Sequence, residues 1–97
     1  MDIAYLPETF RKDVQNAVAI LNSYGATHIY VFGSLVEKDR AAGARDIDIA
    51  VEGLPPESFF RAYGKLMMKL DHEFDLIDLS DESAFVRRLT KDHRLSL

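Results

Sequence analysis

Two apolar segments, each with polar residues at one end, constrain this chain more than any other feature. An apolar run that ends at Phe32 is followed by Gly33 and Ser34, and a second run opens with Asp46 and Asp48. Because alternate residues of a strand share one face, the two aspartates should project together, with Cα atoms roughly 7 Å apart. Such carboxylates can converge on cations, and a Gly-Ser turn can present backbone N–H groups to phosphate. The pattern is typical of a nucleotide site.

Hydrophobic periodicity predicts the remaining elements and an α/β fold. Helical spacing of apolar residues indicates one helix over residues 7–24, closed by Gly25, and another from about 56 to 70. Runs rich in β-branched and aromatic residues indicate strands over 27–32, 46–52 and 73–79, and Ser80 or Asp81 is expected to cap a last helix. This order predicts a small α/β sandwich with at least one strand–helix–strand crossover.

The second predicted helix carries a long apolar stripe, which we expect to belong to the core rather than to a ligand pocket. Gly64 lies inside this helix, and close packing of the helix on the sheet is the expected reason for a glycine there. The stripe consists of Phe59, Phe60, Tyr63, Leu66, Met67 and Leu70.

Length, charge and composition limit the classes of function. The 97 residues are expected to form a single domain spanning residues 1–97. There is no cysteine, no apolar run near the ~20 residues of a membrane span and no signal-peptide pattern, so a cytoplasmic location without membrane contact is expected. The net charge of −4 argues against broad, sequence-independent nucleic-acid binding but not against a small metal-bound nucleotide. Direct sequence-specific binding of nucleic acid is not expected either.

The motif resembles the signature of the DNA polymerase beta-like nucleotidyltransferase superfamily. Gly33-Ser34 is separated by eleven residues from Asp46-x-Asp48, and a third acidic strand follows near the end of the chain. The short length and the order of elements resemble the minimal nucleotidyltransferase (MNT) branch, usually encoded beside a HEPN-domain partner. The resemblance implies an α/β fold with a small three-stranded mixed sheet flanked by helices, and Mg²⁺ (two ions) as the cofactor.

The resemblance also implies a set of catalytic carboxylates. Asp46 and Asp48 would hold the metal ions, and a third acid would come from the strand over 73–79. Asp75 and Asp78 have opposite parity there and cannot face the same side of a regular strand. The family pattern corresponds to Asp75, which leaves Asp78 as a loop or helix-cap residue.

Four residues are expected to bind the nucleotide: Gly33 and Ser34 at the turn, and Lys38 and Arg45 from the following loop. Ser34 also fits the N-cap of a short helix, with Glu37 reaching back in a capping box, and the two roles are compatible. A solvated loop that carries charges is the more common reason for such loop cations.

Two functions are consistent with the sequence. The first is an enzyme that moves a nucleoside monophosphate, expected to be AMP from ATP, to a hydroxyl on a protein acceptor, as the antitoxin of a HEPN/MNT toxin–antitoxin pair. The second is a catalytically degenerate MNT-fold protein that neutralises a HEPN partner by binding alone. Retention of all three acids favours the first. The segment after Ser34 favours the second, because Leu35 and Val36 stand where family members often carry basic and glycine residues. An oligomer is compatible with either.

Overall fold

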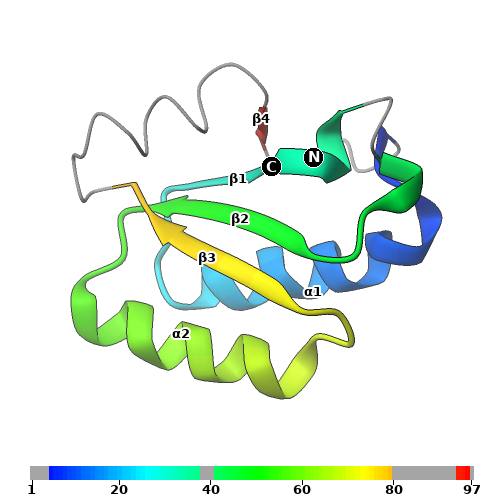
Figure 1. Cartoon of the computed structure of the whole chain (residues 1–97). Coiled ribbons are helices and arrows are strands. Elements are labelled where there is room, and N and C mark those ends of the chain that lie inside the picture. The colour runs from blue at the N-terminus through cyan, green and yellow to red at the C-terminus, as the bar shows by residue number, and fades with distance from the viewer. Residues whose placement is uncertain (1–4, 38–40, 80–93, 97) are drawn as a thin grey trace.

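The computed structural model describes residues 5–37, 41–79 and 94–96 (Figure 1). Two α-helices, two short 3₁₀ helices and four strands occur in these ranges, and the last helix expected from the sequence lies outside the described residues. The elements are α1 (Glu8–Ser23), β1 (His28–Phe32), η2 (Gly33–Val36), η3 (Ala41–Gly43), β2 (Ile47–Glu52), α2 (Pro56–Lys69), β3 (Phe74–Asp78) and β4 (Arg94–Ser96).

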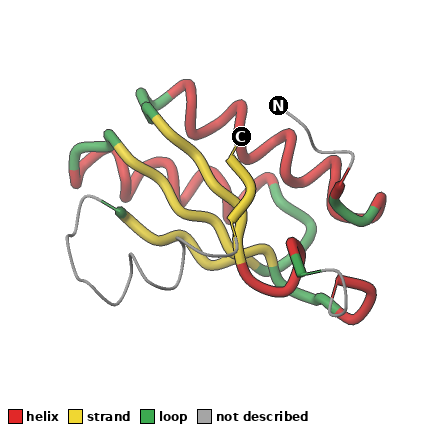
Figure 2. The backbone as a smooth tube through the Cα atoms, turned by 90° about the horizontal axis from the view of Figure 1, so that it is seen from above, coloured by secondary structure: helices red, strands yellow, loops and turns green. Residues whose placement is uncertain are grey.

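The strands form one mixed sheet in the order β3-β2-β1-β4 (Figure 2). β1 pairs antiparallel with β2 and with β4, whereas β2 pairs parallel with β3. The parallel pair is joined by α2, which confirms the predicted crossover and the mixed sheet flanked by helices. The three predicted strands all form, and the short strand β4, which the sequence analysis did not anticipate, extends the sheet beside β1.

Helix α1 forms because its apolar residues fall on one side at helical spacing. Phe10, Val14, Val18 and Leu21 are all buried in the main hydrophobic core. After the last turn, Gly25 adopts a left-handed backbone conformation with φ of 102°, as expected at a helix C-terminus. Within the described ranges, no helix has the length and the hydrophobicity that a bilayer crossing requires.

Both α-helices lie on the same face of the sheet (Figure 1). On that face, Ile47, Ile49 and Val51 of β2 are fully buried against the helices. The residues that alternate with them point to the opposite face, where Phe32 and Ala50 belong to a second, smaller apolar cluster. We call this second side the open face. The alternation of β2 therefore separates the main core from the open face.

The prediction for the apolar stripe of α2 was wrong in part. Only Ala62 and Leu66 of this helix are fully buried, whereas Phe60 is 77% exposed and Met67 is 66% exposed. Gly64 is also exposed, and a Cβ built on it would have no atom within 4 Å, so packing on the sheet is not the reason for this glycine. The apolar stripe is wider than the narrow strip of helix surface that contacts the sheet.

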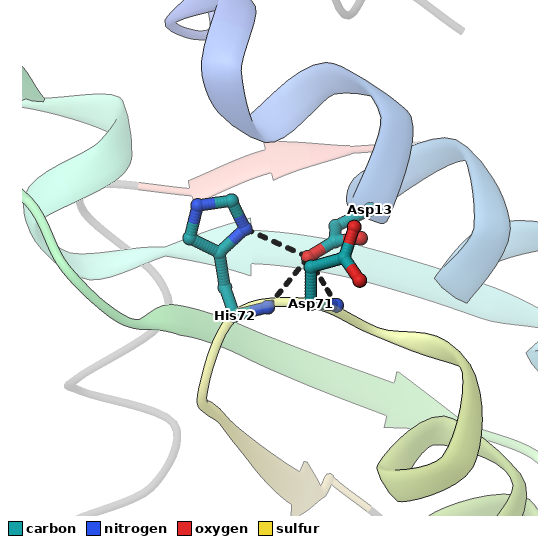
Figure 3. Close-up of polar contacts among 3 residues, drawn as sticks. All are labelled: Asp13, Asp71 and His72. Atoms are coloured by element: carbon teal, nitrogen blue, oxygen red, sulfur yellow. Dashed lines mark hydrogen bonds and ion pairs between the residues drawn. The ribbon is translucent and has the colours of Figure 1, made fainter.

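One buried carboxylate connects α1 to the loop before β3 (Figure 3). Asp13 is 2% exposed, and its Oδ2 accepts hydrogen bonds from the backbone N–H groups of Asp71 at 2.9 Å and His72 at 2.8 Å. The His72 Nδ1 lies 2.7 Å from the same oxygen, and its ring packs 4.2 Å from that of Phe10. His72 is thus a half-buried partner of this carboxylate.

The environment of Asp13 acts on its pKa in two directions. Burial raises the pKa of the carboxyl, because it disfavours the charged form. The hydrogen bonds from His72 and Asp71 and the attraction to the His72 ring outweigh this effect, so the pKa is lowered from its ordinary value of 3.8. Asp13 is thus a buried charge that its donors hold in the ionised form.

Replacing Asp13 should destabilise the fold, because two backbone donors would lose their acceptor. We expect Asp13→Ala to lower the free energy of unfolding by about 2–3 kcal/mol, the scale of hydrogen bonds to a charged group. Urea denaturation is the measurement. Gln15→Ala, at an exposed position of the same helix, is the control and should change stability by less than about 0.5 kcal/mol. Equal stability of the two variants would contradict a structural role for Asp13.

The contribution of the Asp13 carboxylate to the free energy of unfolding should depend on pH in a defined direction. A group whose pKa is lower in the folded state stabilises the protein above its unfolded-state pKa, and this contribution is lost as the pH falls through the folded-state pKa. The stability difference between the wild type and Asp13→Asn should therefore be constant near neutrality and shrink below about pH 4. A difference that grew on acidification would show that the assigned direction is wrong.

Candidate active site

The turn after β1 places Gly33 against the side chain of Asp48. Gly33 opens η2 with φ of 75°, a conformation that side chains disfavour. A Cβ at this position would lie 3.2 Å from Asp48 Cγ and still closer to its Oδ2. Two independent constraints, the backbone conformation and the carboxylate, therefore require glycine here. Phosphate was the group predicted to approach Gly33, and the structure adds the Asp48 carboxylate.

Strand pairing aligns Asp48 with one acid of β3. Asp48 is the register partner of Phe32 on β1 and of Asp75 on β3. Because directly paired residues of neighbouring strands share a face, both carboxylates project from the open face, away from α1 and α2. Asp48 is half-buried there, and Asp75 is exposed.

Asp78 lies on the other side of the same strand. It pairs with Val51 and alternates in phase with Phe74 and Leu76, which pack against the core under the helices. Strand parity therefore brings Asp75, and not Asp78, beside Asp48. The sequence alone could not make this distinction, because apolar residues occupy both faces of β3.

Asp46 sits at a bend immediately before β2 and is exposed. The strand start is fixed against β3, because the backbone N–H of Ile47 donates to the carbonyl oxygen of Glu73 at 2.9 Å. Asp46 is thus held at the same end of β2 as Asp48, two residues away. Arg45, also exposed, precedes it directly, which places one guanidinium at this end of the sheet.

The structure changes the interpretation of the segment after Gly33. Ser34 lies inside η2, the residue at the N-cap position is Phe32, and no side-chain cap hydrogen bond is present at this helix. The predicted N-cap role of Ser34 was therefore wrong, and its backbone carbonyl instead accepts the N–H of Glu37 at 3.3 Å. Leu35 is 1% exposed and belongs to the core. Lys38 lies outside the described residues.

Residues 15–95 match the family described as Polymerase beta, Nucleotidyltransferase. The chain belongs to this family. The match includes β1, the Gly33 turn, the aspartate pair and β3, which together form the site described above. No curated protein sequence matches the chain significantly.

Solved structures of MNT proteins share the fold. A crystal structure of a mutant MntA–HpeT toxin–antitoxin matches with 26% identity and a TM-score of 0.67 over 87% of this chain and 69% of the other. A toxin–antitoxin with AMP-PNP matches with 26% identity and a TM-score of 0.66, covering 84% and 70% of the two chains. A tri-AMPylated Shewanella oneidensis HEPN toxin in complex with MNT antitoxin matches with 24% identity, a TM-score of 0.67 and coverage of 89% and 69%. These likenesses identify an MNT-type nucleotidyltransferase fold.

The donor set fits the Mg²⁺ that this family generally uses. Within the described ranges no three His, Asp or Glu side chains come together as a metal-binding group. Magnesium, however, is commonly bound through one or two carboxylates together with substrate phosphates rather than by a cage of protein ligands. Asp48 and Asp75, paired in register on one face, supply two such carboxylates.

A side chain at Gly33 should disturb the site through Asp48. We expect Gly33→Ala to lower stability by about 1–2 kcal/mol, because alanine must adopt a left-handed conformation, and to weaken Mg²⁺-ATP binding by displacing the carboxylate. Isothermal titration calorimetry and thermal unfolding measure the two effects.

Gly53→Ala is the matched control for that experiment. Gly53 also has a positive φ, 93°, and a Cβ there would clash with Thr27 instead of with an aspartate. This variant should lose comparable stability and keep its affinity for Mg²⁺-ATP. Equal losses of affinity in both variants would reduce Gly33 to a structural turn residue.

Proposed function

We propose that this chain acts as one nucleotidyltransferase domain that moves AMP from ATP to a hydroxyl group of a protein acceptor, with Mg²⁺ as cofactor. The proposed acceptor is a HEPN-domain toxin, for which this chain would be the antitoxin. The observation that carries the proposal is the pairing of Asp48 with Asp75 on the open face, next to the Gly33 turn. Membership of the nucleotidyltransferase family supports the reaction class.

Each polar group at this end of the sheet has a role in the proposed reaction. Asp48 and Asp75 would hold Mg²⁺, which neutralises phosphate charge when it is bound. Asp46, the third predicted ligand, does not come together with them in one metal-binding group, so its part in holding the metal stays a prediction, as does the presence of two ions. The Gly33-Ser34 turn would present backbone N–H groups to the triphosphate. Arg45 is exposed and would pair with phosphate oxygens.

The transfer replaces a phosphoanhydride bond of ATP with a phosphoester bond to the acceptor. The acceptor hydroxyl oxygen forms a bond to the α-phosphorus of ATP, the bond between that phosphorus and the α–β bridging oxygen breaks, and pyrophosphate leaves with the bonding electrons. The hydroxyl proton passes to a carboxylate oxygen of Asp75. This residue suits the role because it is the exposed member of the register pair and can meet an acceptor carried by another molecule.

Similar solved structures support the proposed acceptor. One is a tri-AMPylated HEPN toxin in complex with an MNT antitoxin, and another is a toxin–antitoxin with AMP-PNP. By similarity, AMP is the proposed group and a HEPN protein the proposed partner of this chain.

One observation favours the alternative of neutralisation by binding alone. Leu35, which follows the Gly-Ser turn, is buried in the core, and Glu37 places an acid close to the proposed triphosphate site. Neither residue type contributes a positive charge to a triphosphate. A catalytically degenerate chain would still retain the fold and its partner surface.

The two acids of β3 provide a matched test of the catalytic assignment. Asp75→Asn should reduce AMP transfer by orders of magnitude while leaving the fold intact, because it removes a ligand charge and the proton acceptor. Asp78→Asn, on the opposite face of the same strand, should retain transfer and affect mainly stability. Transfer is measured with labelled ATP and circular dichroism reports folding. The reverse result would mean that Asp78 is the third carboxylate.

Co-expression with a HEPN-domain partner tests the proposed acceptor. Intact mass spectrometry should detect additions of AMP size on the partner with the wild-type chain, and none with the Asp46→Ala/Asp48→Ala variant. Loss of toxicity should accompany the modification. An unmodified partner that both chains silence equally well would instead establish neutralisation by binding.

A further inference from the structure

One row of paired residues crosses all four strands at the candidate site. Asp48 of β2 pairs with Asp75 of β3 on one side and with Phe32 of β1 on the other. Phe32 pairs in turn with Arg94 of β4. Because directly paired residues of neighbouring strands belong to the same face, Arg94 occupies a position on the open face, in the same row as the two carboxylates. The sheet therefore brings an arginine to the end of the row that lies opposite to Asp75.

The residue pattern of β4 supports this register. Leu95 pairs with Val31, which is fully buried in the main core under the helices. The residues on either side of Leu95 are the polar Arg94 and Ser96, and alternation assigns both positions to the open face. A slip by one residue would place the arginine charge at a core position, which is costly. The apolar partner of Val31 therefore favours the register that puts Arg94 in the row.

The strand β4 also lies next to the Gly33 turn. This turn follows Phe32 directly, and Phe32 is the register partner of Arg94. The 3₁₀ helix η2, which begins at Gly33, contacts β4 (Figure 1). In the proposed reaction the turn would hold the triphosphate. The arginine is therefore placed on the side of the site where phosphate is expected.

The segment after the turn gives the proposed triphosphate no positive charge. Leu35 is buried in the core, and Glu37 is an acid. Arg45 is one described cation at this end of the sheet, and Arg94 would supply a second. Arginine suits phosphate because its planar guanidinium can donate two parallel hydrogen bonds and keeps its charge at physiological pH.

The order of residues in the row fits the direction of the proposed transfer. Neighbouring strands lie about 4.8 Å apart, so about 10 Å separates the backbone of β4 from that of β2, with Phe32 of β1 between them. A long arginine side chain and a polyphosphate can span this distance together. In an in-line transfer, the acceptor and the leaving group lie on opposite sides of the α-phosphorus. With the acceptor at Asp75, the leaving group extends toward β1 and β4.

We propose that Arg94 binds the β- and γ-phosphates of ATP and the pyrophosphate that leaves. This inference rests on the proposed nucleotidyl transfer and deepens it by naming a further cation of the triphosphate site. The guanidinium stays protonated throughout and transfers no proton. It pairs with the negative charge that pyrophosphate gains when the bond between the α-phosphorus and the bridging oxygen breaks.

The affinity for magnesium nucleotides tests this assignment without an acceptor. Arg94→Gln removes the charge and should weaken the binding of Mg²⁺-ATP at least about tenfold in isothermal titration calorimetry. Arg94→Lys keeps a charge but lacks the planar fork, so its affinity should fall between those of Arg94→Gln and the wild type. The matched control is Arg61→Gln, which changes an exposed arginine on α2, across the sheet from the row, and should bind Mg²⁺-ATP as the wild type does.

The length of the phosphate chain separates a binding role of Arg94 from a structural one. Mg²⁺-AMP lacks the β- and γ-phosphates, so its affinity should be unchanged in Arg94→Gln, whereas the affinity for Mg²⁺-pyrophosphate should fall with that for Mg²⁺-ATP. Equal weakening of AMP and ATP binding, or ATP binding as tight as in the wild type, would overturn the role of Arg94 alone. A wild-type chain that binds no Mg²⁺-ATP would overturn the proposed function and this inference together.

Discussion

The fold and the candidate site both depend on the alternation of side chains along β2. Ile47, Ile49 and Val51 are buried under the two helices, whereas Asp48 projects from the open face with Ala50. Burial of these apolar residues holds β2 between β1 and β3. The backbone hydrogen bonds to the two neighbouring strands then fix the position of Asp48. A slip by one residue would bury the aspartate and expose the core, so the hydrophobic effect also fixes the position of the carboxylate.

The hydrogen bonds of the buried Asp13 support the position of the second carboxylate of the site, Asp75. The buried Asp13 carboxylate binds the backbone of Asp71 and His72, and this loop leads directly into β3. The next residue, Glu73, accepts the hydrogen bond that aligns the start of β2 with β3. The hydrogen bonds that Asp13 of α1 accepts therefore hold the chain where β3 begins, and support the alignment of Asp75 with Asp48. A stabilising residue remote from the open face thus supports the geometry of the site.

The sequence predicted those features that depend on local patterns. The three principal strands, both helices and the Gly33 turn follow from periodicity and glycine placement. The exposed side of α2 could not be predicted in this way. An apolar stripe that includes both Leu66 and Phe60 does not reveal which part of the stripe the sheet covers. Asp13 was missed for a related reason: a polar residue on a helix suggests solvent, and its donors are 58 and 59 residues away in sequence. The choice between Asp75 and Asp78 likewise required the register of two strands.

The two surfaces of interest lie on different layers of the molecule. Asp48 and Asp75 project from the open face of the sheet, whereas α2 covers the other face and turns Phe60 and Met67 away from the core. The helices therefore leave the carboxylates accessible to a nucleotide and to an acceptor carried by another molecule. The sheet separates the two surfaces physically, so a substitution at Phe60 does not touch the acids, and a substitution at Asp75 does not touch the helix.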